Sequence, residues 1–253
     1  MARDMDAYLR EEIQQTPFCP GCGHGILMGA ILRAIDSLGL PMDRMLFVSG
    51  IGCAAWIPSP HFKADTLHTL HGRAVAFATG AKLYNPELIT LVVSGDGDLS
   101  SIGGNHLIHA ARRNLDITVI CANNMIYGMT GGQVASTTPL GAQSSTTPAG
   151  NPEPPFDLCK LVQAAGATYV ARYGVVQPLL LQRAIQRGLQ HKGFSFIEAL
   201  SPCPTQFGRR NRMGDAAQVL KGLQESLVSK KEASKLSRED LQGRVVYGEF
   251  VNG

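Results

Sequence analysis

The sequence has no long hydrophobic run, and charges of neither sign dominate it. No apolar stretch in the 253 residues approaches the ~18 residues that span a bilayer, which excludes a transmembrane helix. The formal net charge of +3 is too small to indicate a nucleic-acid-binding protein. The segment Met1–Thr16 is polar and charged, unlike a signal peptide. These absences predict a soluble, cytoplasmic protein.

Internal repeats and two common site motifs are missing as well. The glycine-rich stretch that begins at Gly95 has Ser100 where G-x-G-x-x-G requires glycine, so the sequence excludes a Rossmann dinucleotide site there. Three histidines lie close together, but they lack the H-E-x-x-H spacing and imply no zinc site: His61, His68 and His71.

The apolar content, 44% of the residues, supports a sizeable hydrophobic core in a chain of this length. Residue patterns predict helices over 25–38, 73–84, 101–114, 156–165 and 178–190. They predict strands over 45–49, 88–94, 117–122, 168–171 and 195–200. Such alternation is typical of a doubly wound, mostly parallel α/β sheet. We therefore expect one α/β domain over residues 1–253.

Two segments depart from this alternation. Residues 129–155 are rich in Gly, Ser, Thr and Pro without periodicity, and that length favours a functional loop over a spacer. From residue 213 onward the chain is predicted to be helical and charged. It ends in residues 244–250, which we expect to form a strand or a docking segment.

Polar motifs follow two successive apolar runs. Gly95-Asp96-Gly97-Asp98 closes the first run, and Asn123-Asn124 closes the second about one crossover helix later. The carboxyl ends of neighbouring parallel strands are where an open α/β sheet binds ligands. Glycines allow a phosphate to approach the backbone, and carboxylate and amide oxygens suit Mg²⁺. Alone, either motif could be a turn or a helix cap; together they resemble the thiamine diphosphate (TPP) motif.

This motif predicts a magnesium site and a cofactor crevice. Asp96 would bind the metal directly, and Asn124 would supply its side-chain oxygen. The helix after Asp98 would direct its amino terminus at the phosphates. The expected cofactor contacts are Gly52, Cys53, His71, Gly95, Asp96, Gly97, Asp98, Asn124, Ile126, Tyr127, Gly128, Met129 and Thr130.

Six cysteines are unusual for a chain of this kind, and without a secretory context they favour metal or redox use over disulfides. For Cys121 and Cys159, in a predicted strand and helix, we expect buried free thiols. The other four suit either Zn²⁺ or an iron–sulfur cluster: Cys19, Cys22, Cys53 and Cys203. Only one C-x-x-C pair is present, which favours a cluster over zinc, with spare core thiols as a third option.

Several stretches together resemble the β subunit of 2-oxoacid:ferredoxin oxidoreductases, of the 2-oxoglutarate type. The stretches that carry the resemblance begin with Cys19-Pro-Gly-Cys-Gly-His24, Gly50-Ile-Gly-Cys53, His68-Thr-Leu-His71-Gly-Arg73 and Gly95-Asp-Gly-Asp98. The others are Gly103-Gly-Asn105-His106, Asn123-Asn124, Ile126-Tyr-Gly-Met-Thr-Gly-Gly132 and Ser201-Pro-Cys203. The similarity runs from about Thr16 to Asn211.

The resemblance implies a 4Fe–4S cluster on Cys19, Cys22, Cys53 and Cys203, with TPP and Mg²⁺ close by. It adds the carbonyl of Ile126 as the third protein ligand of Mg²⁺. The N-terminal loop, about residues 16–25, would bind the cluster, and the tail, about 213–253, would dock on partner subunits.

The implied reaction is CoA-dependent oxidative decarboxylation of 2-oxoglutarate to succinyl-CoA and CO₂, with electrons passed to ferredoxin. It could also run in reverse. Pyruvate or another 2-oxoacid is the alternative substrate, and a non-redox TPP decarboxylase subunit with structural zinc is the alternative class. The family also implies an α subunit and an (αβ)₂ assembly. The motif-bearing loops contain no glutamate suited to activate TPP, which agrees with a partner that supplies one.

One departure concerns the substrate. Relatives often carry a basic residue after the third cluster cysteine, but this chain reads Cys53-Ala54-Ala55-Trp56. The group that binds the substrate carboxylate must therefore come from elsewhere, such as the α subunit or a histidine.

Histidines and arginines complete the set of candidates. His71 is the candidate catalytic residue, with a helix cap as the alternative, and His24 could lie near the cluster. A solvated or subunit-facing patch is expected from Arg209, Arg210 and Arg212, with a CoA or ferredoxin contact as the alternative.

Overall fold

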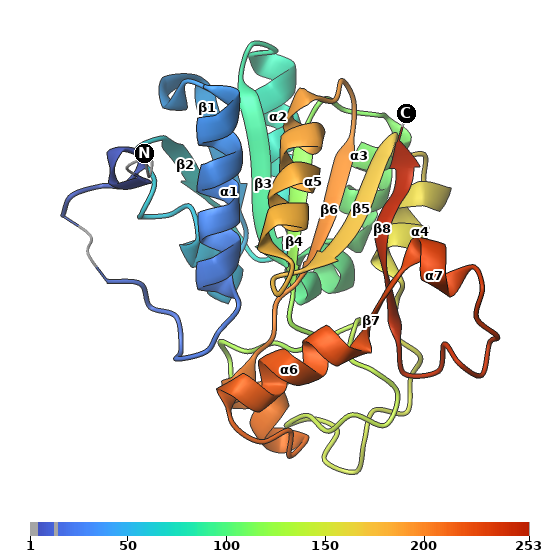
Figure 1. Cartoon of the computed structure of the whole chain (residues 1–253). Coiled ribbons are helices and arrows are strands. Elements are labelled where there is room, and N and C mark those ends of the chain that lie inside the picture. Colours follow the sequence, from blue (N-terminus) through green and yellow to red (C-terminus); the bar gives the residue numbers. More distant parts are fainter. Residues whose placement is uncertain (1–4, 13–14, 253) are drawn as a thin grey trace.

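The computed structural model describes residues 5–12 and 15–252, and its centre is one eight-stranded sheet (Figure 1). The strand order is β2-β1-β3-β4-β6-β5-β8-β7. The strands are β1 (Met45–Ser49), β2 (Asp65–His68), β3 (Ile89–Gly95), β4 (Thr118–Asn123), β5 (Tyr169–Gly174), β6 (Ser195–Leu200), β7 (Leu227–Ser229) and β8 (Val245–Asn252). All neighbours pair in parallel except β5 and β8, which are antiparallel.

Helices cover both faces of the sheet. They are α1 (His24–Leu38), α2 (Ala74–Tyr84), α3 (Gly104–Arg112), α4 (Leu158–Ala164), α5 (Pro178–Gln190), α6 (Ala216–Ser226) and α7 (Lys230–Ala233). In Figure 1, α1 and α5 lie in front of the sheet, and α2, α3 and α4 lie behind it. The arrangement confirms the predicted doubly wound, mostly parallel α/β fold. No helix of the described chain is long and apolar enough to cross a membrane.

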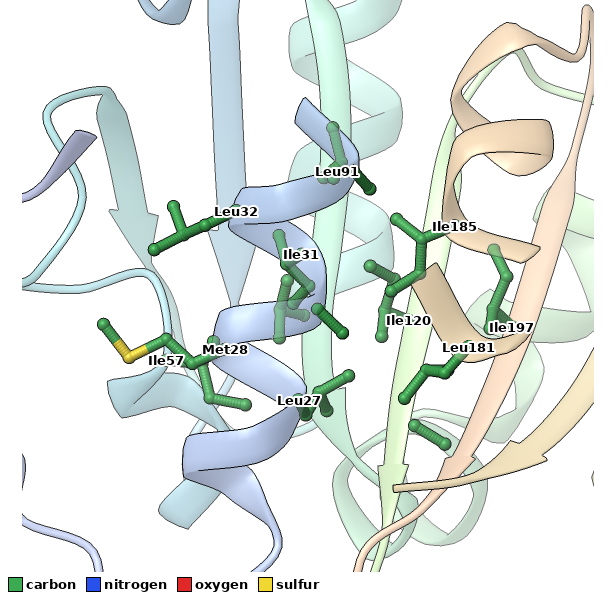
Figure 2. Packing of buried hydrophobic residues seen from close by; sticks show 14 of the residues in the cluster. Leu27, Met28, Ile31, Leu32, Ile57, Leu91, Ile120, Leu181, Ile185 and Ile197 are labelled. Carbon is green, nitrogen blue, oxygen red and sulfur yellow. The ribbon is translucent and has the colours of Figure 1, made fainter. Parts of the chain in front are cut away.

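The front layer is built from the apolar stripes of α1 and α5. Leu27 and Ile31 of α1 are fully buried against the strands, where they meet Leu181 and Ile185 of α5 (Figure 2). The one-turn spacing within each pair puts its side chains on one helix face. Helix α1 ends at Gly39, whose left-handed backbone (φ 60°) forms the C-cap predicted from the glycine there.

The carboxyl ends of the parallel strands meet at one edge of the sheet, and the functional motifs lie there. Strands β3 and β4 are direct neighbours, with Gly95 paired to Ala122, so the two motifs of the predicted TPP site are brought side by side. Helix α6 and the long loop between β4 and α4 lie at this same edge (Figure 1). As predicted, residues 129–155 contain no helix or strand.

Edge strand β2 and the start of the helical region after β3 differ from the sequence prediction. Edge strand β2 was not predicted, because its residues are mostly exposed and form no apolar run. The chain after β3 turns into a π-helical segment, Gly97–Ile102, before α3 begins, so the helical region starts earlier than predicted. At the C-terminus β8 is a strand, as one alternative held, and it pairs with β5 of the chain's own sheet.

Candidate functional site

A cavity of about 640 Å³ opens at the carboxyl ends of β1, β3 and β4. It gathers every residue expected to contact the cofactor: Gly52, Cys53, His71, Gly95, Asp96, Gly97, Asp98, Asn124, Ile126, Tyr127, Gly128, Met129 and Thr130. Six more residues complete its lining: His24, Ile51, Ala54, Gln133, Val134 and Thr146. The loops after three strands thus converge on one space, as expected for an open α/β sheet.

Asp96 is a buried carboxylate at the base of this cavity, 1% exposed. It accepts hydrogen bonds from the Thr137 hydroxyl and from the backbone N–H of Asn124, the latter at 3.2 Å. No Lys, Arg or His of the described chain forms an ion pair with it. Burial therefore raises the pKa of Asp96 to about 6, although these hydrogen bonds lower it. A buried carboxylate that no cationic side chain neutralises is suited to bind a metal cation.

The turn after β4 presents further oxygen atoms to the same space. The Asn124 side-chain oxygen accepts from the N–H of Ile126 at 3.1 Å, and both residues line the cavity. Between them, Met125 has a left-handed backbone, with φ of 64°. Carboxylate, amide and carbonyl oxygens on neighbouring loops are the donor set that Mg²⁺ prefers. The residues predicted from the motif therefore fit this metal.

Asp98 ties three loops together beneath the cavity. Its Oδ1 accepts from the N–H of Ile51 at 3.1 Å, from the N–H of Gly72 at 2.7 Å and from His71 Nδ1 at 2.6 Å. Its Oδ2 accepts from the Ser94 hydroxyl at 2.6 Å. Asp98 is only 3% exposed, so these bonds satisfy a charge that is otherwise costly to bury. The role of Asp98 as an organising carboxylate could not be distinguished from cofactor contact in the sequence.

His71 lies directly before α2, at the rim of the cavity. Its Nδ1 is held by Asp98, and its ring packs edge-on against Tyr127 at 5.7 Å between centroids. Because Nδ1 is engaged, Nε2 is the ring nitrogen free for other contacts. His71 is therefore oriented by its neighbours, which a helix cap does not require.

Tyr127 and Gly97 show why glycine follows Asp96. The Tyr127 hydroxyl donates to the Gly97 carbonyl at 3.0 Å. A Cβ atom at position 97 would lie 2.5 Å from the tyrosine ring, too close for any residue but glycine. Burial raises the pKa of Tyr127, which keeps its phenol protonated as a donor.

The four cysteines singled out in the sequence converge next to the cavity. A Cβ atom at Gly128 would lie 3.5 Å from Cys203 Sγ and 3.8 Å from Cys53 Sγ, so the glycine lets the loop pass close to both sulfurs. Burial raises the pKa of Cys22 to about 12, and the neighbouring Cys203, Cys53 and Cys19 raise it further. Burial, Cys203 and Cys19 likewise raise the pKa of Cys53 to about 11. Four thiols from three parts of the chain thus lie near one another.

These thiols fit a metal cluster chemically. With their raised pKa values, Cys22 and Cys53 stay protonated in the protein alone, and bound iron would replace their protons. Among the residues that the structure describes, no three His, Cys, Asp or Glu side chains are arranged around a single-ion site. The oxygen site at Asp96 contains only one such side chain, since its other donors are an amide and a carbonyl.

His24 lines the cavity and lies beside Cys22, one of the four cysteines. Its backbone N–H bonds to Cys22, and its Nδ1 lies 2.7 Å from the Ser201 hydroxyl. The imidazole is 1% exposed, and burial lowers its pKa to about 4, so it is neutral. Its Nε2 is buried without a partner in the described structure.

The arginine cluster divides into two environments. Arg209 and Arg212 are exposed in an open hollow beside Pro20, which fits the predicted solvated patch. Arg210 differs, because it is half-buried and its Nη2 donates to the Gly131 carbonyl at 2.9 Å. It therefore holds the long loop and is not part of a solvated patch.

Four residues of the long loop were not singled out in the sequence: Gln133, Val134, Thr137 and Thr146. Their only signal was the composition of residues 129–155, because nothing in the order of the residues shows which of them turn toward Asp96. The cavity lining contains no Glu, Lys or Arg among the described residues. Among the described residues, this lining thus has no glutamate to activate TPP and no Lys or Arg for a substrate carboxylate, and its basic side chains are His24 and His71.

Comparisons with known proteins agree with this geometry. Residues 50–199 match the family described as thiamine pyrophosphate enzyme, C-terminal TPP binding domain. The chain is similar to the 2-oxoglutarate synthase subunit KorB of Methanothermobacter marburgensis, with 50% identity over 97% of this chain and 86% of that relative. It is 40% identical to the 2-oxoglutarate oxidoreductase subunit KorB of Mycobacterium tuberculosis, over 76% of this chain and 51% of that one.

A solved structure is also similar to this chain. The 2-oxoglutarate:ferredoxin oxidoreductase of Magnetococcus marinus, with 2-oxoglutarate, coenzyme A and succinyl-CoA bound, superimposes with a TM-score of 0.87. The identity is 31%, and the match covers 100% of this chain and 86% of that one. The cavity, the converging cysteines and these similarities lead to one conclusion. The chain belongs to the thiamine pyrophosphate enzymes and, among them, to the KorB family of 2-oxoacid:ferredoxin oxidoreductase β subunits.

Proposed function

We propose that this chain is the β subunit of a 2-oxoglutarate:ferredoxin oxidoreductase. With an α subunit it would convert 2-oxoglutarate and CoA to succinyl-CoA and CO₂ and pass electrons to ferredoxin. The observation that carries the proposal is the convergence of Cys19, Cys22, Cys53 and Cys203 beside a cavity lined by the TPP motif. A decarboxylase without electron transfer would use four thiols next to its cofactor for a structural metal such as zinc, not for its reaction.

In this proposal the magnesium ion is held by Asp96, the Asn124 side chain and the Ile126 carbonyl. The four cysteines hold a 4Fe–4S cluster, with the loop 16–25 supplying two of them. Bound TPP would supply the electron sink for decarboxylation, and the cluster would accept electrons singly. The chain's own residues place these groups and exclude water: Asp98 fixes His71 at the cavity rim, and His71 Nε2 contacts the cofactor or the substrate.

The proposal assigns the missing groups to the partner. The cavity lining has no Glu, Lys or Arg among the described residues, so the α subunit would supply the carboxylate that activates TPP and a cation for the substrate carboxylate. Alanines follow Cys53, which leaves this side of the cavity uncharged. The enzyme would assemble as (αβ)₂, with the tail 213–253 contributing to subunit contacts, and would work in the cytoplasm, where free thiols persist.

The test begins with anaerobic purification of this chain together with its α subunit. We expect about four iron and four sulfide per β subunit, with an absorbance band near the blue edge of the visible. Zinc in place of iron would favour the non-redox decarboxylase. A preparation that contains neither metal would contradict the proposed cluster.

Substrate choice has its own assay. CoA-dependent reduction of a viologen dye should be much faster with 2-oxoglutarate than with pyruvate. Comparable rates with the two acids would contradict the assignment to 2-oxoglutarate and favour a broader 2-oxoacid enzyme.

A further inference from the structure

Three polar side chains lie side by side within the apolar layer between the sheet and α4. They are Asn123 of β4, Glu198 of β6 and Arg172 of β5, which are 5%, 2% and 7% exposed. Their surroundings are apolar side chains such as Val170 and Phe196. Removing the charges of Glu198 and Arg172 from water is unfavourable, so their presence here needs an explanation. The proposed reaction gives none of the three a role.

Hydrogen bonds join the three residues into a directed series. Arg172 Nε donates to Glu198 Oε2 at 2.7 Å, and Arg172 Nη2 donates to Asp157 Oδ1 at 2.5 Å. The other oxygen of Glu198, Oε1, accepts from Asn123 Nδ2 at 2.7 Å. Glu198 therefore has one oxygen on the arginine and the other on the asparagine.

This series of hydrogen bonds ends at the turn that is proposed to hold Mg²⁺. Asn123 Oδ1 accepts the backbone N–H of Met125 at 2.9 Å. Met125 has a left-handed backbone, with φ of 64°, which is unfavourable for a residue other than glycine. It stands between Asn124 and Ile126, the two proposed metal ligands of the turn. The bond from Asn123 thus supports the one strained residue on which their mutual placement depends.

Glu198 decides which way the amide of Asn123 faces. An ionised carboxylate only accepts hydrogen bonds, and a guanidinium only donates them. With Arg172 on one side, Glu198 requires the NH₂ group of Asn123 to face it, which directs the amide oxygen toward the N–H of Met125. If the amide turned over, its oxygen would face the Glu198 oxygen, two acceptors together, and its NH₂ group would face the N–H of Met125, two donors together.

We propose that Glu198, anchored by Arg172, is a positioning residue for the magnesium site. It orients Asn123 so that the turn 124–126 is held in its metal-binding form before the ion arrives. This inference rests on the proposed function, because it deepens the role of that same magnesium site. A buried ion pair that only joined β5 to β6 would not need its second oxygen on Asn123.

The test uses the assembled enzyme, this chain with its α subunit, after Mg²⁺ is removed with a chelator. Equilibrium dialysis of TPP over a Mg²⁺ titration gives the Mg²⁺ concentration at half-saturation. The variants are Asn123→Asp, Glu198→Gln and the two combined. Thr118→Val is the matched control, because it removes a buried side-chain hydrogen bond at the opposite end of β4, from Thr118 to the Gly188 carbonyl.

Each single variant breaks this series of hydrogen bonds. The double variant restores it with the amide at position 198 and the carboxylate at position 123. Asn123→Asp sets two carboxylates against each other, and Glu198→Gln sets two NH₂ groups against each other. In the double variant, the new amide at position 198 accepts from Arg172 and donates to the new carboxylate at position 123. That carboxylate still accepts from Met125, and the total charge is unchanged.

We expect each single variant to raise the half-saturating Mg²⁺ concentration by roughly 10- to 100-fold. The double variant should lie within about threefold of the unsubstituted enzyme, since the pair is coupled. Thr118→Val should leave the Mg²⁺ requirement unchanged even where it lowers the melting temperature. If Asn123 and Glu198 had only a structural role, the single variants would change the melting temperature and leave the Mg²⁺ requirement unchanged.

Three outcomes would overturn the inference. One is folded single variants with the original Mg²⁺ requirement, and another is a double variant no better than the single ones. If a single variant fails to assemble, Asn123→Ala takes its place, because it leaves the N–H of Met125 without its acceptor. An unchanged Mg²⁺ requirement in that variant would be the third outcome. An unsubstituted enzyme that binds TPP without Mg²⁺ would instead refute the proposed magnesium site itself.

Discussion

Two buried carboxylates of this chain stand in contrast. Glu198 has a cation of its own, Arg172, 2.7 Å away, whereas within the described chain Asp96 has only a hydroxyl and a backbone N–H. Both side chains lie in the sheet region and are 2% exposed or less. The difference shows which charge the fold has neutralised for itself and which it leaves for a ligand. Asp96 lies in the cavity, where an incoming cation can reach it, and Glu198 does not.

Removing the cation of the paired carboxylate should have the largest effect on stability. Arg172→Met leaves Glu198 charged and buried without compensation, and we expect the free energy of unfolding to fall by about 3–5 kcal/mol. Urea unfolding of the assembled enzyme measures it. Adding Glu198→Gln to this variant should recover part of the loss, because the uncompensated charge is then gone. A loss below about 1 kcal/mol would mean that water, not Arg172, stabilises Glu198.

Removing the unpaired carboxylate should affect binding and not stability. Asp96→Asn replaces a proposed metal ligand by a neutral amide, and we expect the half-saturating Mg²⁺ concentration for TPP to rise at least about 100-fold. Without Mg²⁺ and TPP the variant should be as stable as the original or more so, since it buries no lone charge. Equilibrium dialysis measures the Mg²⁺ requirement, and thermal unfolding measures the stability. Asp116→Asn, on the surface beside Lys82, is the control and should not change binding.

Asp98 is an intermediate case. Besides His71, the groups that bond it are neutral: two backbone N–H groups and a hydroxyl. Asp98→Asn keeps the shape but loses charge assistance in its bonds to Ile51, His71 and Gly72. We expect a loss of about 1 kcal/mol for each bond that weakens. Denaturant titration would detect the change. If stability were unaffected, the view of Asp98 as the anchor of three loops would be wrong.

The smallest effect concerns the outer end of the arginine pair. Burial would raise the pKa of Asp157, but the guanidinium of Arg172 outweighs it and holds the pKa below its usual value. Asp157 therefore adds stability above its unfolded pKa of about 3.9, and this stability is lost as the pH falls through the lower folded value. We expect about 1 kcal/mol or less, because Asp157 is partly exposed.

The variant Asp157→Asn isolates this contribution, since asparagine also caps α4. The difference in unfolding free energy between the original chain and the variant should be constant from neutral pH to about pH 5 and shrink below it. A difference that grew as the pH fell would contradict the assignment.

Much of the sheet was predictable because its strands are short apolar runs with sharp ends. The runs that end at Gly95 and Asn123 became β3 and β4, and their polar residues lie at the same sheet edge. Strand β2 was missed, since an exposed edge strand needs no apolar run. Strand β8 was left between two alternatives, because only its neighbour β5 shows that it completes the sheet.

For the site, motif residues could be predicted and their supports could not. Asp96 and Asn124 stand out through the glycines and asparagines around them. Thr137, which bonds Asp96, lies in a loop of similar residues, and Glu198 lies in an apolar strand. Nothing local distinguishes either from an ordinary residue of its segment.

The amino-acid sequence alone determined the chemistry: which segments are strands, which of their ends carry oxygen ligands, and which cysteines form a set. These properties are local, since they depend on apolar runs, glycines and short spacings. Only the tertiary structure decided the pairing of distant groups, such as Glu198 with Asn123 and Arg172. The order of strands in the sheet places those residues side by side, and that order is set by the packing of the whole chain.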